Sequence, residues 1–330
     1  MTEVTNSRRS RPRPQALPLS RAGVLQYLPI GQESTSRFDT LGGMALELDF
    51  KRIRTLTITP LFSDDLLFER LVLKGGNAIS LVHGLSSRVS LDLDFSMEEG
   101  FEDLDEAHGR MERALRERFA PFEIEPLDVK LYRKPSVERA DLPWWGGYVL
   151  EFKLVEAERR RTMGASLARL RREALAVGPA HLRVFQVEFS KGEYCQGKVR
   201  AELDDYTIFV YPPLMIAVEK LRAVCQQMEE YPHRGRTRSP RAQDFYDIHC
   251  LATREGLRFD SPETMDLTRA VFAAKEAPLR LLGLIGRQRE FHRTGWPAVR
   301  DSAREEVESY DFYFDFVLKA VEPLHILWME

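Results

Sequence analysis

The chain has 330 residues, of which 43% are hydrophobic and 30% are charged, so it is long and apolar enough for one large or two modest domains. Its net charge of −3 excludes a molecule that is basic over its whole surface, and any nucleic-acid site must be a local patch. The three cysteines are far apart in the sequence, which argues against disulfides and leads us to expect a cytoplasmic protein. The histidines lack the spacing of metal ligands, which argues against a zinc site.

The N-terminal third begins with a segment that we expect to be a flexible basic tail, residues 1–20, because its prolines and arginines cannot build a core. Residues 21–70 predict mostly helix, with a loop around residues 31–43. The segment 58–76 predicts a helix that ends at two glycines. No stretch approaches the ~20 apolar residues that a membrane helix needs.

A helix is predicted next, over residues 77–85, and a strand over residues 88–96. Alternate residues of a strand share a face, so Asp92 and Asp94 point the same way while the leucine between them enters the core. Two such carboxylates are hard oxygen ligands that suit Mg²⁺ together with substrate phosphates. A pair of acids in an apolar strand also costs stability unless a cation offsets it.

Gly75 and Gly76 lie just before this helix, where bare backbone can approach phosphate groups. Taken singly, two glycines are a turn and an Asp-Leu-Asp triplet is a solvated strand face. Their ordered combination favours a site, and it indicates nucleotide-dependent phosphoryl or nucleotidyl transfer.

The rest of the chain predicts an α+β protein. Residues 102–120 form an amphipathic helix with acids early and arginines late, as the helix dipole prefers. Strands are predicted over residues 128–134, 146–156 and 182–190, with a basic helix over residues 158–178. From residue 211 onward the pattern is almost entirely helical. A small mixed sheet covered by helices, followed by a helical region, is the expected architecture.

A two-metal site usually includes a third carboxylate on a neighbouring strand. Glu188 and Glu151 are the candidates, and Glu188 is preferred because apolar residues flank it as they flank the two aspartates. For either glutamate, an edge-strand side chain in water is an equally good interpretation.

Two further residues follow in the helical region. Lys220 lies in a helix opened by prolines, where it either grips a triphosphate as a point charge or is a solvated surface lysine, which spacing alone favours. Asp244 lies at the start of a later helix, one turn before Asp247. It orients Lys220 or a substrate hydroxyl, or it caps the helix.

Arginines gather in two places that could contact a phosphate backbone. The loop 231–243 contains no acid and holds Arg234, Arg236, Arg238 and Arg241. The basic helix over residues 158–178 is the second place, although a charge run on a helix is usually a solvated face.

Ordered motifs between about residues 65 and 255 match one known family. They are Lys74-Gly75-Gly76-Asn77; Arg88, Ser90, Asp92, Asp94 and Phe95; Val187-Glu188-Phe189; Pro213, Glu219-Lys220-Leu221 and Ala223; and Gln243-Asp244-Phe245-Tyr246-Asp247-Ile248. In this order they resemble the AbiEii/AbiGii-type nucleotidyltransferase toxins of the DNA polymerase β-like superfamily. Asn77 stands where that family usually has Ser or Thr, and Gln243 stands where it usually has Arg.

The resemblance implies a minimal nucleotidyltransferase sheet within residues 21–205 and an all-helical C-terminal domain in residues 206–330. It implies Mg²⁺-dependent transfer of an NMP from an NTP to an RNA acceptor, the tRNA 3′ end in related toxins, which blocks translation. The expected context is a toxin–antitoxin or phage-defence pair with a cognate antitoxin. A protein acceptor, or a non-catalytic nucleotide-binding module, is the alternative.

The same resemblance assigns roles to residues. It places Asp92, Asp94 and the candidate Glu188 at the metal, and Asp92, Asp94, Lys220 and Asp244 in catalysis. The nucleotide would be held by Lys74, Gly75, Gly76, Asn77, Ser90 and Lys220.

Overall fold

The computed structural model describes residues 49–86, 88, 90, 92–163, 166–176, 181–233 and 237–329. The predicted tail and most of the predicted helices before residue 50 therefore lie outside the described residues. Within them, no helix is both long and apolar enough to span a lipid bilayer.

A seven-stranded mixed sheet forms the centre of the fold, in the order β3-β4-β5-β2-β1-β7-β6. Its pairs β1–β7 and β2–β5 are parallel, and the others are antiparallel. The strands are β1 (Val72–Lys74), β2 (Leu93–Ser96), β3 (Ile124–Lys134), β4 (Gly147–Glu156), β5 (Phe185–Ser190), β6 (Val199–Leu203) and β7 (Tyr206–Val210). The predicted small mixed sheet and the α+β class are confirmed.

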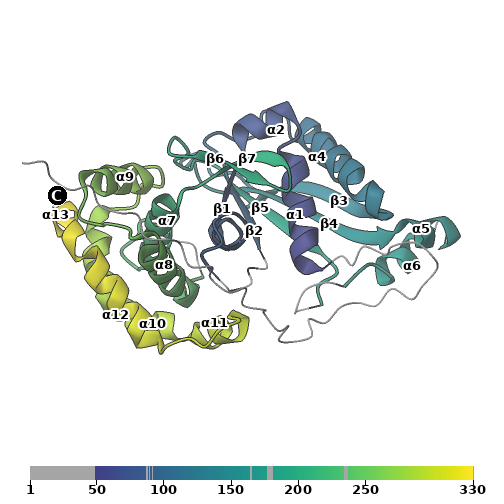
Figure 1. Cartoon of the computed structure of the whole chain (residues 1–330). Coiled ribbons are helices and arrows are strands. Elements are labelled where there is room, and N and C mark those ends of the chain that lie inside the picture. Colours follow the sequence, from purple (N-terminus) through teal and green to yellow (C-terminus); the bar gives the residue numbers. More distant parts are fainter. Residues whose placement is uncertain are drawn as a thin grey trace, which may run out of the picture. The chain divides into compact units, whose positions relative to one another are not determined.

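Helices before β3 cover one part of this sheet, and α4 packs on β3 and on α1 (Figure 1). They are α1 (Phe50–Leu61), α2 (Asp65–Arg70), the short α3 (Gly75–Asn77) with the π-helical turn η1 (Ala78–Val82), and α4 (Leu104–Phe119). The amphipathic pattern predicted α4 well, and Asp103 caps its start by accepting hydrogen bonds from the backbone of Asp105 and Glu106.

Two sequence expectations about the helices are wrong. The segment 58–76 is not one helix. It contains the end of α1 at Leu61, then the separate helix α2, and then strand β1. The basic segment 158–178 contains two short helices, α5 (Ala157–Met163) and α6 (Leu167–Arg172). Helical periodicity continues across such breaks, so it does not reveal the turn between consecutive short helices.

After β7, the described chain is helical, and helix packs on helix around α7 and α8 (Figure 1). The elements are α7 (Pro213–Cys225), α8 (Ala242–Glu255), α9 (Pro262–Ala273), η3 (Leu279–Gln288), α10 (Arg289–Arg293), α11 (Trp296–Ser302), α12 (Tyr310–Val321), η4 (Glu322–Leu324) and α13 (His325–Trp328). Strand β7 belongs to the sheet, so the sheet reaches Val210, beyond the boundary predicted at residue 205.

Candidate active site

Two of the expected carboxylates and one lysine lie in a row across three neighbouring strands. Asp94 of β2 lies opposite Lys74 of antiparallel β1 and beside Glu188 of parallel β5. Paired residues on adjacent strands present their side chains on the same face. Asp92, two residues before Asp94, lines the same cavity as these three. The strand predicted over residues 88–96 is shorter than expected, since β2 begins at Leu93 and Asp92 lies just before it, but both aspartates line one cavity.

Gly75 adopts a backbone conformation that side chains disfavour, with φ of +68°. A Cβ atom at this position would lie 2.8 Å from Oδ2 of Asp94, and one at Gly76 would lie 2.7 Å from Oγ of Ser90. The two glycines thus let the backbone pass directly beside the acid row, as the phosphate-approach interpretation requires.

Gly75→Ala is expected to cost about 1 kcal/mol of stability and most of the activity, because the added methyl group meets Asp94. Gly256→Ala is the matched control. Gly256, at the end of α8, also has a left-handed backbone, with φ of +62°, but no atom lies within 4 Å of the place that an added methyl group would take. Thermal unfolding and nucleotide transfer would be measured for both variants. Equal loss of activity in the two would contradict a role for the close approach to Asp94.

Asn77 does not present its side chain to the cavity, which corrects the expectation that it binds phosphate. It is fully buried, and its amide oxygen accepts a 2.8 Å hydrogen bond from Arg54. Its amide nitrogen donates to the backbone oxygen of Asp92 at 2.5 Å. Asn77 therefore supports the segment that carries Asp92, a task for which an amide, with both a donor and an acceptor, is suited.

A chain of alternating charges faces the acid row from the helical side. The ammonium of Lys220 on α7 lies 2.8 Å from carboxylates of both Asp244 and Asp247 on α8. Arg241 extends the chain at 2.6 Å from Asp244, and Arg88 extends it at 3.0 Å from Asp247. The sequence did not predict that Arg88 and Asp247 form a pair.

Lys220 is buried, with 4% of its surface exposed, so the solvated-lysine interpretation is wrong. Although burial alone favours the neutral amine, Asp244 and Asp247 outweigh it and raise the pKa of Lys220. Burial likewise opposes ionisation of Asp244, yet Arg241 and Lys220 lower its pKa to about 2. Lys220 and Asp244 are therefore both charged at neutral pH. The apolar surroundings of Lys220 in α7 were the signal that a charge there must be paired.

A second buried charge cluster joins the sheet to α7, and most of its members were missed from the sequence. Lys74 lies 3.4 Å from Glu193 and from Glu219. Arg222 lies 2.8 Å from Glu193 and 3.3 Å from Glu219. Despite desolvation, these carboxylates raise the pKa of Lys74, so it stays a cation beside Asp94. Lys74 lines the cavity, but its ammonium is already shared between two glutamates.

Asp94 is the acid whose ionisation is most opposed. Burial raises its pKa to about 6, with Asp92 and Glu188 adding to the effect and Lys74 opposing it. A carboxylate in this setting gains from a nearby divalent cation, since the cation offsets both the desolvation and the repulsion between acids.

Glu188 and Glu151 differ in position. Glu188 lines the cavity, but its carboxylate lies 2.6 Å from the ammonium of Lys134. Glu151 lies outside the cavity lining. On β4 it is opposite Gln186 of β5, two residues before Glu188, and its carboxylate accepts a hydrogen bond from the hydroxyl of Tyr132. This placement removes Glu151 as a candidate ligand. In the described part of the chain, no three His, Cys, Asp or Glu side chains form a ready metal-ligand group.

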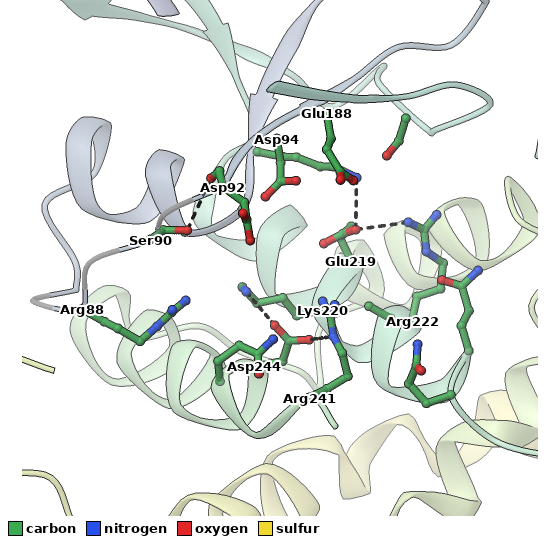
Figure 2. Close-up of a pocket in the computed structure, with 18 of the residues that line it drawn as sticks. Arg88, Ser90, Asp92, Asp94, Glu188, Glu219, Lys220, Arg222, Arg241 and Asp244 are labelled. Carbon is green, nitrogen blue, oxygen red and sulfur yellow. Dashed lines mark hydrogen bonds and ion pairs between the residues drawn. The ribbon is translucent and has the colours of Figure 1, made fainter. Parts of the chain in front are cut away.

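The cavity lies between the acids on the strands and the charged residues of the helical region, and its volume of about 610 Å³ is within the range of small-molecule sites. Figure 2 shows Asp92, Asp94 and Glu188 on one side and Lys220, Arg241 and Asp244 on the facing side. Acids and cations thus face each other across a space of nucleotide size.

Several described arginines of the two predicted patches are engaged within the protein. The guanidinium carbon of Arg238 lies 3.9 Å from the centre of the Phe291 ring, and its Nε donates to the backbone oxygen of Gln227. This corrects the expectation that Arg238 is free to contact a phosphate backbone. Arg241 belongs to the cavity wall, and Arg234 and Arg236 lie outside the described residues. In the basic helices, three arginines form ion pairs with carboxylates: Arg159, Arg160 and Arg171.

Comparison with known proteins decides the family. Residues 59–319, most of the chain and all of the cavity, match the family model described as "Nucleotidyl transferase AbiEii toxin, Type IV TA system". The chain belongs to the AbiEii nucleotidyltransferase toxin family. It is therefore an enzyme of the nucleotidyltransferase class, and membership implies an NTP substrate and an antitoxin partner.

Solved structures similar to this AbiEii-family chain include JHP933 from Helicobacter pylori, with 15% identity, 83% of this chain and 92% of that chain covered, and a TM-score of 0.41. Another is MenT4, a nucleotidyltransferase toxin from Mycobacterium tuberculosis, with 15% identity, 83% and 82% covered, and a TM-score of 0.42. No curated protein matches the chain.

Proposed function

We propose that this chain is the toxin of a toxin–antitoxin pair that transfers an NMP from an NTP to the 3′ end of an RNA, with tRNA as the acceptor, and so blocks translation. The observation that carries the chemistry is the cavity in which Asp92 and Asp94 face the ion-paired Lys220. In this reaction the acceptor hydroxyl oxygen bonds to the α-phosphorus and loses its proton to solvent, while the bond between the α-phosphorus and the α–β bridging oxygen breaks and pyrophosphate leaves.

Mg²⁺ fits the residues present. Asp92 and Asp94 supply hard oxygen ligands on one face, and the raised pKa of Asp94 indicates a carboxylate that lacks sufficient positive charge nearby. Bound Mg²⁺ would supply charge neutralisation at the phosphates. Glu188 is the proposed third ligand, and it would have to leave Lys134 to take part.

The other residues act on the phosphates. Gly75 and Gly76 bring backbone close to the triphosphate, with Ser90 beside them. Lys220 stabilises the charge that develops as pyrophosphate leaves. Asp244 is a positioning residue, because its carboxylate accepts a 2.8 Å hydrogen bond from the ammonium of Lys220 and so fixes the place of that ammonium. Lys74 contributes a fixed positive charge next to Asp94.

The RNA acceptor rests on the resemblance and on Arg88 and Arg241, which line the cavity although each is also paired with an aspartate. The ion pairing of the basic helices and the packing of Arg238 favour a second candidate, in which the same chemistry modifies a Ser, Thr or Tyr hydroxyl of a protein. A protein acceptor does not need an extended phosphate-binding surface.

A label-transfer assay separates the two candidates. Protein, Mg²⁺ and each α-³²P-labelled NTP in turn are incubated with total cellular RNA and, separately, with total protein. We expect labelled RNA of tRNA size that disappears with Asp94→Ala, and growth inhibition by the wild type that the cognate antitoxin relieves. Label on protein would replace the RNA acceptor by the second candidate. Label in neither pool, with intact NTP binding, would support a non-catalytic nucleotide-binding module.

A further inference from the structure

Helix α1 carries a buried arginine that has no acidic partner. Arg54 is 6% exposed, and the other buried residues of the helix are apolar or threonine. Within the described residues, no carboxylate lies within ion-pair distance of its guanidinium, and Arg54 does not line the cavity. Burying a cation without a counter-ion costs stability, so the contacts of Arg54 need an explanation. Arg54 also precedes residue 59, where the match to the family model begins.

The guanidinium of Arg54 holds the segment that leads into β2, both directly and through Asn77. Its Nη1 donates to the backbone oxygen of Ser90 at 3.0 Å and to the amide oxygen of Asn77 at 2.8 Å. The ring of Phe50, one turn earlier on α1, lies 4.7 Å from the guanidinium carbon and favours its positive charge. Burial, with Arg304 adding to it, lowers the pKa of Arg54 to about 10, so the group is charged at neutral pH.

The contact with Arg54 also decides which way the amide of Asn77 points. A guanidinium only donates hydrogen bonds, so it takes the amide oxygen and leaves the amide nitrogen on the other side. That nitrogen donates to the backbone oxygen of Asp92 at 2.5 Å. The hydroxyl of Ser90 donates to the same oxygen at 3.5 Å (Figure 2).

Asp92 depends on these side chains because it lies just outside the sheet. The pairing of β2 with its neighbours begins at Leu93, one residue later. Asp94, by contrast, is paired with residues of the strands on both sides. Strand pairing therefore fixes one of the two aspartates, and hydrogen bonds from side chains fix the other.

We propose that Arg54 is a positioning residue for the metal site, an inference that rests on the proposed function. It acts on Asp92 by holding Ser90 and by orienting Asn77, and it does not reach the cavity itself. The matched part of the chain supplies both aspartates, and α1, which begins before the matched part, supplies the anchor for one of them. Groups that hold a metal ligand in place typically change metal affinity about 10- to 100-fold when they are removed.

The test measures equilibrium binding of Mn²⁺, a paramagnetic substitute for Mg²⁺, to the full chain without nucleotide. Arg54→Met keeps the apolar stem and removes the donors, and it should weaken Mn²⁺ binding about 10-fold. Arg54→Lys, which keeps a charged donor, should recover most of the affinity. Arg52→Met is the matched control on the same helix. The guanidinium of Arg52 pairs with Asp204 at 2.6 Å, and its removal should leave Mn²⁺ binding unchanged.

A double-mutant cycle separates positioning from a general effect on folding. In the Asp92→Asn background, Arg54→Met should weaken Mn²⁺ binding no further, because the carboxylate through which Arg54 acts is gone. Circular dichroism shows that each variant is folded at the assay temperature. If Arg54→Met does not fold, Asn77→Asp takes its place. This variant keeps an oxygen for Arg54, removes the donor to Asp92, and should weaken Mn²⁺ binding to the same extent.

Equal Mn²⁺ affinity of the wild type and the folded variant would overturn the role of Arg54. A loss that persists in the Asp92→Asn background would overturn it too, because the effect would not pass through Asp92. Absence of Mn²⁺ binding by the wild type would overturn it together with the proposed metal site. Binding is measured without turnover, so the role of Arg54 can stand if label transfer fails, and label transfer can succeed if this role is wrong.

Discussion

Asp94→Asn is expected to abolish nucleotidyl transfer and toxicity while making the metal-free protein more stable by about 1–2 kcal/mol. Ionised Asp94 is disfavoured in the folded state, where burial and neighbouring acids raise its pKa from 3.8 to about 6. A shift of this size corresponds to about 3 kcal/mol at most, and contact with solvent in the cavity reduces it. Asparagine keeps the shape and removes the charge.

The sign of the pH dependence follows from the direction of the shift. Between pH 4 and pH 6 the folded wild type binds more protons than the unfolded chain, so Asp94 makes stability fall as pH rises through this window. The advantage of Asp94→Asn should therefore be complete above pH 6 and disappear near pH 4. Activity should show the opposite trend, falling as the pH drops below 6, because only the carboxylate binds a cation.

Chemical denaturation at pH 7.5 and pH 4, with and without Mg²⁺, measures these effects. Mg²⁺ should stabilise the wild type and not the variant. Asp105→Asn, at an exposed position in the first turn of α4, is the control and should cost only a few tenths of a kcal/mol without loss of activity. An active Asp94→Asn enzyme, or one destabilised in metal-free buffer at pH 7.5, would contradict the assignment of Asp94.

The second large effect is expected at Lys220. Lys220→Met should cost about 3–5 kcal/mol of unfolding free energy, because it leaves Asp244 and Asp247 buried without their shared cation. Transfer activity should also be lost at temperatures far below the melting point of the variant. Both losses have one cause, since the same ammonium neutralises the aspartates and faces the cavity.

Urea unfolding and label transfer at low temperature would be compared with those of Lys319→Met, which removes an exposed lysine from α12. The control should remain within about 0.5 kcal/mol of the wild type and fully active. If Lys220→Met were as stable as the wild type, Arg241 and Arg88 would suffice to neutralise Asp244 and Asp247, and the stabilising role assigned to Lys220 would be wrong.

The long, strongly periodic elements were predictable, and the short ones were not. The patterns indicated α4, α7, β4 and β5 close to where they lie, whereas β2 begins five residues later and β3 four residues earlier than predicted. Strand β1 has only three residues, too few for a periodic signal. The sequence patterns did not indicate the hairpin of β6 and β7. Its turn is formed by Asp204 and Asp205, which both have positive φ, as a two-residue hairpin turn requires and as Asp tolerates.

The sequence by itself determined the acid pair, the glycines, the strand that presents the acids and, through ordered motifs, the enzyme family. These features depend on spacing within a few residues, where the period of a strand or helix decides which side chains share a face. Partners for the buried charges were decided only by the tertiary structure. Lys74 meets Glu193 from 119 residues away, and Lys220 is buried because α8 brings two aspartates against α7. A charge pattern shows that a side chain is ionisable, but its pKa, its burial and its role depend on which distant groups folding places beside it.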